Sequence, residues 1–465
     1  MILLQRLGLN RIPWTAELAG ILLVYFVQGA IGLARLATTF YFKDNLGLSP
    51  SQTAALTGIA VIPWTVKPLY GWLSDHLPLA GYRRRPYLLL SGVLGCLAWL
   101  VLALWANSVW LATAMVTLGS LSVAIGDVIV DSLVVERSRS QDWAGTGSLQ
   151  SLSWGATALG SLVTAYLGGL LLQHYSPQMV FGLTAGLPLL TVLAVGLIQE
   201  APVQESAPFA LRSQIQQIVG ALRQPAIGLP ILFVFFWQAT PNAESAFFYF
   251  VTNDLGFGAE FLGQIRLVSS LALLLGVAIF QLYLRWIPLR PLFAWITLIS
   301  AGLGLTSLIL VYHLNRAWGI DDHWFSLGDT LILTVAGQIA YMPILVLAAR
   351  LCPAGIEATL FALLMSILNL AGFLSHEWGA GLMQWLGISE HDFSHLGDLV
   401  VITNLVRLLP LLLLGWLPAQ LPNSASPSPG DPSGASLGAE ALDWREGDLS
   451  LARATEAAQE SVGIL

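Results

Sequence analysis

The chain has 465 residues, of which 56% are hydrophobic and only 10% are charged. This composition, with a mean hydropathy of +0.72, excludes an ordinary soluble domain, in which about 25% of residues are charged. The formal net charge of −7 comes mostly from the segment 419–465, so we expect neither a nucleic-acid partner nor an acidic docking surface. The two cysteines, Cys96 and Cys352, lie far apart in apolar segments, which predicts neither a disulfide nor a metal site.

Apolar segments long enough to cross a bilayer follow one another along the chain, since a spanning helix needs roughly 20 residues. The first six are 17–41, 52–74, 86–106, 109–135, 146–172 and 179–199. The second six are 226–252, 260–284, 289–313, 327–349, 357–386 and 397–418. We therefore predict an all-α membrane protein with twelve transmembrane helices in two six-helix bundles, an outline typical of transporters.

Polar segments set the expected domain boundaries. Residues 200–225 form the longest polar interruption before the tail and predict a cytoplasmic linker between an N-terminal bundle, 1–199, and a C-terminal bundle, 226–418. Residues 419–465 are rich in Pro, Ser, Gly and acidic residues. Such a segment buries too little apolar surface to order itself, so we expect a disordered acidic cytoplasmic tail.

Lysine and arginine are distributed unequally over the predicted loops. Loops on the side opposite the N-terminus contain only Lys43 and Arg316, whereas most arginines fall on the N-terminal side. Because basic loops stay in the cytoplasm, we expect both termini to be cytoplasmic, in a bacterial inner membrane. The apolar segment that begins near Glu17 is too long for a signal-peptide core, so we expect it to stay in the membrane as the first span.

The loop between the second and third spans, KPLYGWLSDHLPLAGYRRRPY, concentrates the charge of its neighbourhood. We expect this loop to act as a hydrated hinge and inner gate between the two spans. The residues expected to form the gate are Asp75, Arg83, Arg84, Arg85 and Glu136. An alternative is that Asp131 and Glu136 pair with the three arginines in a purely structural role, because charges inside a membrane usually pair.

This loop resembles the signature between helices two and three of the major facilitator superfamily, with Gly71, Asp75, Gly81 and the following arginines at matching positions. The insertion HLPLA lengthens the interval, and LRWIPLRP, between helices eight and nine, lacks the matching Gly and Asp. More closely, the chain resembles the folate-biopterin transporter family. The stretches that carry this resemblance are KPLYGWLSDHLPLAGYRRRPYLLLSG, GLARLATTFYFKDNLGLSPSQ, GDVIVDSLVVERSR, GSLQSLSW, PNAESAFFYF and ARLCPAGIEATLFALLMS. The resemblance implies a major-facilitator fold, folates or pterins as cargo, and proton coupling.

Asp127 and Asp131 are four residues apart and therefore lie on one face of the fourth span. Two neighbouring carboxylates in a membrane disfavour being ionised together, so this pair is our candidate proton-coupling site. An ion pair with the gate arginines is the alternative for Asp131 in particular.

Basic residues inside the spans are candidates for binding the carboxylates of a substrate. Arg35 lies among small residues on the first span, and Lys67 and Arg266 lie on the second and eighth. A guanidinium can grip a carboxylate with two hydrogen bonds, which an ammonium cannot. Snorkelling to the membrane surface is the competing interpretation for Arg35 and Lys67.

An acid beside aromatic residues suits a flat heteroaromatic amine such as a pterin. On the seventh span Trp237, Pro241, Glu244 and Phe248 fall on one helical face, and we expect Glu244 and Phe248 to bind such a ring by accepting hydrogen bonds and stacking. An aromatic belt with a solvated Glu244 is the alternative.

Two further sets of residues are weaker candidates. Gln150 and Trp154, four apart on the fifth span, form a second possible ring site. Arg407 falls near the middle of the twelfth span and needs a partner. Since Glu377 is the nearest acid in span order, we predict a structural ion pair between them.

Nothing in the chain resembles an enzyme, since it contains no phosphate-binding Gly loop with Lys and no metal-ligand spacing, and its seven histidines are scattered. We expect no enzymatic activity, no cofactor and no metal. The residues alone favour transport of an anionic or amphipathic solute by a monomer in the lipid bilayer, through alternating access. Transport of another organic anion or drug, and a receptor that binds without translocating, remain as alternatives.

Overall fold

The computed structural model describes residues 14–138, 143–202, 216, 219–220, 222–284, 287–350 and 357–418. The first helices are α2 (Ala16–Ala30), α3 (Leu33–Phe40), the π-helix η2 (Tyr41–Asn45), α4 (Pro50–Thr65), α5 (Lys67–His76), α6 (Arg85–Leu104), α7 (Val109–Ser138), α8 (Trp143–His174) and α9 (Pro177–Val195). We call these helices the N-terminal group.

The remaining helices form the C-terminal group. They are α11 (Pro225–Gln238), α12 (Glu244–Tyr249), η3 (Phe250–Asp254), α13 (Ala259–Ile279), η4 (Phe280–Leu284), α14 (Leu289–Gly304), α15 (Ser307–Val311), α16 (Leu314–Ala317), α17 (Asp322–Arg350), α18 (Glu357–Trp385), α19 (Leu396–Val406) and the 3-10 helix η5 (Leu409–Trp416). Nine helices of the described chain are long and apolar enough to cross a bilayer. The protein is thus an all-α, multi-pass membrane protein, and the number of twelve spans stays a prediction.

Prolines break three of the predicted spans. The second span breaks at Val66, between α4 and α5, because Pro68 has no N–H to donate to the carbonyl four residues earlier. The seventh span breaks between α11 and α12, around Pro241. The twelfth ends its α-helix at Val406, four residues before Pro410, and continues as η5. Each break leaves backbone groups that other parts of the protein must satisfy.

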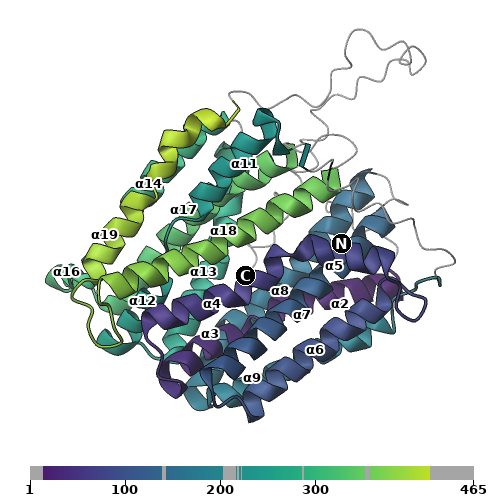
Figure 1. Ribbon diagram of the computed structural model, residues 1–465. Coiled ribbons are helices and arrows are strands. Elements are labelled where there is room, and N and C mark those ends of the chain that lie inside the picture. The colour runs from purple at the N-terminus through teal and green to yellow at the C-terminus, as the bar shows by residue number, and fades with distance from the viewer. Residues whose placement is uncertain are drawn as a thin grey trace, which may run out of the picture.

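The two groups of helices lie side by side, and two helix pairs make most of the contact between them (Figure 1). In Figure 1 the purple α4 runs along the green α18, and α8 of the N-terminal group packs against α13 of the C-terminal group. We call the junction of α4 and α18 the α4–α18 seam. The two bundles and the boundaries that the polar linker predicts for them stay a prediction.

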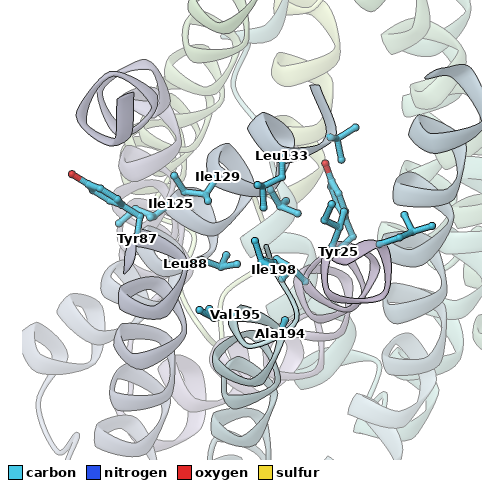
Figure 2. Packing of buried hydrophobic residues seen from close by; sticks show 14 of the residues in the cluster. Tyr25, Tyr87, Leu88, Ile125, Ile129, Leu133, Ala194, Val195 and Ile198 are labelled. Atoms are coloured by element: carbon cyan, nitrogen blue, oxygen red, sulfur yellow. The ribbon is translucent and has the colours of Figure 1, made fainter. Parts of the chain in front are cut away.

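The core of the N-terminal group is an apolar cluster between α2, α6, α7 and α9 (Figure 2). Leu88, Ile129 and Ala194 are fully buried in it. Tyr25 and Tyr87 lie at opposite borders of the cluster, and Figure 2 shows their hydroxyl groups pointing away from Ile198, which lies between them. The hydroxyl groups of both tyrosines therefore lie at the edges of the core, where they can reach partners on neighbouring helices.

One end of the molecule, which carries the loops 46–49 and 255–258, is closed by contacts between the groups, and we call it the closed end. Tyr249 is fully buried there and bonds the Thr53 hydroxyl at 2.9 Å and the Leu48 carbonyl at 2.5 Å. Phe248 packs edge-to-face on Phe40 of the other group. The opposite end, which carries the loop between α5 and α6, is called the linker end below.

Candidate functional site

An ion pair between the two groups joins the first and seventh predicted spans. Arg35 on α3 lies 3.8 Å from Glu244 at the start of α12, and their side chains are 72% and 68% exposed. Their neighbours Ala34 and Ala246 are fully buried. The pair therefore bridges the two groups while both charged ends stay accessible, as a site for a polar solute requires.

The third predicted basic residue approaches the same region from α13. Arg266 donates from Nη1 to the backbone carbonyl of Gly32, at 3.2 Å. Gly32 lies in the turn between α2 and α3, three residues before Arg35. The structure thus brings together Arg35, Glu244 and Arg266, which are far apart in the sequence. We call these three residues the charged cluster.

The break in the seventh span positions Glu244. Asn242 accepts the Glu244 N–H at 3.3 Å and donates its side-chain amide to Ser375 Oγ and His376 Nδ1, each at 3.3 Å. These bonds tie the broken segment to α18. Trp237, on the other side of the break, instead donates to Thr297 of α14 at 3.1 Å. The prediction that Trp237 and Glu244 share one helical face is therefore wrong, because Pro241 interrupts the helix between them.

Sequence reasoning missed Asn242 and His376. The Pro241–Asn242 pair marks a turn, and an amide directly after a helix-breaking proline is the only signal that could have found this residue. His376 carries no such signal, because a single histidine in an apolar span is more often a packed residue.

Phe248 and Trp154, both predicted to contact a ring, lie in different surroundings. Phe248 uses its ring against Phe40, with centroids 5.2 Å apart, as part of the closed end. Trp154 is exposed on α8 and makes no hydrogen bond within the described chain. The side chain of Gln150 lies outside the described part of the chain.

Lys67 forms an ion pair with Asp127, which joins the start of α5 to the middle of α7. Their side chains are only 19% and 17% exposed. Gln28 of α2 completes this site, since its amide can donate to Asp127 Oδ1 at 3.3 Å and accept from the Asp127 N–H at 3.2 Å. The charge of Asp127 is therefore matched by a lysine in this conformation.

Asp131, one turn further along α7, has a neutral partner. The hydroxyl of Tyr25 donates to its Oδ1 at 2.5 Å, and the residue is more exposed than Asp127. The alternative in which Asp131 pairs with the loop arginines is wrong. The reason is that its side chain faces Tyr25 on α2, whereas the arginines lie at the start of α6.

The charged loop is organised by Arg84. This buried guanidinium lies 2.8 Å from Asp75 and 2.7 Å from Glu136, and it also donates to Ser74. The pairing of Glu136 with this loop agrees with the sequence prediction. Both acids belong to the N-terminal group, so these ion pairs join α5, α6 and α7 to one another within that group. A gating role for the loop stays a prediction.

Glu200, which sequence reasoning also missed, holds the backbone of the same loop. Its carboxylate accepts the N–H groups of Arg83, Arg84 and Arg85 at 2.6, 2.9 and 2.9 Å. These N–H groups lie just before and at the start of α6, where the helix offers no internal partners for them. The Arg85 guanidinium lies over the ring of Tyr82. The bonds of Glu200 join residues more than a hundred positions apart, so they leave no local sequence pattern.

The predicted ion pair between Glu377 and Arg407 is wrong. Neither residue makes a salt bridge within the described part of the chain, and Glu377 lies instead against Gly58 of α4. Arg407 follows the last residue of α19, where Pro410 ends the α-helix. Span order suggested that the two residues are close, but the packing of α18 on α4 turns Glu377 toward the other group.

Comparison with known proteins places this architecture in a family. Residues 28–426 match the sequence pattern of the BT1 family. The chain belongs to the BT1 family. A folate-biopterin transporter of Synechocystis sp. is 58% identical over 404 residues, which are 87% of this chain and 82% of that protein. A probable folate-biopterin transporter 2 of Arabidopsis thaliana is 34% identical and covers 86% of this chain and 82% of its own length.

Solved structures agree on the fold. The nucleoside transporter NupG superposes with a TM-score of 0.67 at 12% identity, and the match covers 86% of this chain and 98% of NupG. The BT1-family chain therefore has the major-facilitator type of fold. Its relatives are named as transporters, so the chain belongs to a family of membrane transporters and not of enzymes.

Proposed function

We propose that this BT1-family protein carries folates or pterins across a bacterial inner membrane by proton-coupled symport with alternating access. The name of its relative at 58% identity supports the choice of cargo. The observation that carries the proposal within the chain is the exposed Arg35–Glu244 pair between the two groups of helices. We further propose that the protein acts as a monomer with both termini in the cytoplasm.

A folate offers a partner for each member of the Arg35–Glu244 pair. Its glutamate tail carries carboxylates, which a guanidinium binds with two parallel hydrogen bonds. Its pterin ring carries an amino group and ring N–H groups, which donate hydrogen bonds that a carboxylate can accept. An exposed ion pair contributes only about 0–1 kcal/mol, so cargo can separate Arg35 from Glu244 at little cost and replace each partner. Arg266 would add a second positive charge for the tail.

The proton in this proposal binds at Asp131. Lys67 matches the charge of Asp127, whereas within the described chain Asp131 is held only by the Tyr25 hydroxyl. A proton on Asp131 therefore leaves every charge of this region paired or neutral. When Asp131 is ionised, the region carries one uncompensated negative charge, which favours water access from one side.

The test is uptake of radiolabelled folate into proteoliposomes with an imposed pH gradient. We expect accumulation that follows the gradient and is competed by free pterin. Uptake that is indifferent to the gradient would remove the proton coupling. Saturable binding without accumulation would favour a receptor, and stronger competition by a sugar phosphate or a drug than by pterin would remove the cargo assignment.

Variants separate the two binding roles. Glu244→Gln should weaken binding of both pterin and folate, whereas Arg35→Lys should weaken binding of folate but spare pterin, which has no carboxylate tail. Asp131→Asn should keep cargo exchange across the membrane while it abolishes accumulation. The matched control is Asp398→Asn, which removes an exposed acid that pairs with His395 and not with the charged cluster.

A further inference from the structure

Glu377 has a carboxylate oxygen buried at the α4–α18 seam without a hydrogen-bond partner. Its Oε1 is covered completely and accepts no hydrogen bond within the described chain. The oxygen lies against Gly58 of α4, so closely that a Cβ at Gly58 would be 2.8 Å from it. The absence of a side chain at Gly58 therefore allows the two groups of helices to close onto this carboxyl group.

No charged group in the described part of the chain compensates Glu377. The helices packed against α18 are α4, α11, α5 and α17, and the first two contain no ionisable side chain. Two ionisable residues of α5 form ion pairs with other residues. Lys67 pairs with Asp127, and Asp75 pairs with Arg84. His76 and Tyr70 complete α5, and His76 contacts the Trp72 carbonyl.

The acids and bases of α17 are also engaged elsewhere. Asp322 pairs with Arg316, His323 with Asp321, and Asp329 accepts from Thr306 and Ser307. Tyr341 lies further along α17, and the side chain of Arg350 lies outside the described part of the chain. On α18 itself, His376 is bonded to Asn242. No described cation is therefore placed to neutralise an ionised Glu377.

Glu377 as a whole is half-buried, but ionisation is still unfavourable, because its Oε1 is buried without a donor, loses its hydration and gains nothing in return. The neutral acid loses much less. We propose that Glu377 is a proton-binding site that holds its proton while the α4–α18 seam is closed and releases it when the two helices separate. This inference deepens the proposed function, since it rests on alternating access and assigns a second proton site to the moving seam.

The consequence is a link between pH and conformation. If the closed seam binds one more proton than the open seam, acidification favours the closed arrangement. One linked proton changes the ratio of the two conformations by up to about tenfold per pH unit. In a Glu377→Gln variant the side chain cannot ionise, so it mimics the protonated acid at every pH.

The first experiment measures the separation of the two groups at the closed end by spin labels. Trp110 and Trp324, which are 77% and 74% exposed at the starts of α7 and α17, are replaced by cysteine in a chain whose Cys96 and Cys352 are serine. We expect the short-distance population of the full-length protein to rise as pH falls, and to stay high at every pH in Glu377→Gln. A pH profile in Glu377→Gln equal to that of the parent would overturn the proposal, as would a parent without pH dependence.

Asp329→Asn is the matched control, because Asp329 is a membrane acid that already receives two hydroxyl donors. It should keep the parent pH profile. The second measurement is infrared spectroscopy of the parent at neutral pH, in which the stretching band of a protonated carboxyl should be present and should disappear in Glu377→Gln. If Glu377→Gln does not fold, Glu377→Asp should shift this band, and an unshifted band would contradict the proposal.

Neither measurement uses a cargo, so this proposal and the proposed function can fail separately. Proton-linked closure in a protein that does not accumulate folate would keep the role of Glu377 and remove the cargo. Proton-driven folate uptake with an unchanged pH profile in Glu377→Gln would keep the cargo and remove the role of Glu377.

Discussion

Asn369 of α18 donates its side-chain amide to the backbone carbonyl of Trp64 on α4, at 3.1 Å. In a continuous helix the residue four positions later would satisfy this carbonyl, but that residue is Pro68, which has no N–H. The broken second span of one group is thus completed by a side chain from the other. This bond lies next to Lys67 and joins the two groups between Gly58 and the linker end.

Asn369→Ala should loosen the α4–α18 seam. A hydrogen bond contributes about 1 kcal/mol, so we expect the ratio of closed to open seam to fall about fivefold in the spin-label measurement. Pro68→Ala gives the control, because an alanine N–H at this position can bond the Trp64 carbonyl itself. In the Pro68→Ala background the effect of Asn369→Ala should be much smaller, and an undiminished effect would show that Asn369 acts in another way.

Removing one member of the Lys67–Asp127 pair should destabilise the protein strongly. Both side chains are more than four-fifths buried, and leaving a buried charge without its partner costs about 3–5 kcal/mol. We expect Lys67→Met to lower the thermal unfolding temperature in detergent, and Lys67→Met with Asp127→Asn to recover most of it. Equal instability of the single and double variants would show that shape, and not charge, dominates at this site.

Gly169→Ala should hinder closure between α8 and α13. A Cβ at Gly169 would lie 2.6 Å from the Gly263 Cα and would also meet the Ala259 carbonyl, so the backbones could not approach as they do. We expect the variant to fold but to populate the separated closed end more, as spin labels on Trp110→Cys and Trp324→Cys report. Gly155→Ala on the same helix, where a Cβ meets nothing within 4 Å, should behave like the parent.

Glu200→Ala should weaken the junction of α9 with the loop before α6. The carboxylate accepts three backbone N–H groups, and hydrogen bonds to a charged group contribute about 1.5–3 kcal/mol each in favourable cases. We expect a lower unfolding temperature and faster proteolysis within residues 77–85, with Glu200→Gln intermediate, because an amide oxygen still accepts. Proteolysis of Glu200→Ala at the parent rate would contradict this role.

The breaks at Pro68, Pro241 and Pro410 explain which parts of the site the sequence could predict. A proline marks where a helix can end, but the prediction kept the seventh span as one continuous helix. A proline also does not state how the chain turns at a break. For this reason Trp237 and Glu244, which a continuous helix would place on one face, point to different helices.

The sequence determined the membrane-protein class, the helical architecture and the charged residues inside the spans. Hydrophobic length and the rarity of charge are properties of each segment alone. The energy gained when such a segment is buried in lipid therefore does not depend on the rest of the fold. Only the tertiary structure decided which charges meet. Asp131 meets Tyr25, Lys67 meets Asp127 and Glu377 meets no cation in the described chain, because these outcomes depend on how helices from distant parts of the sequence are rotated against one another.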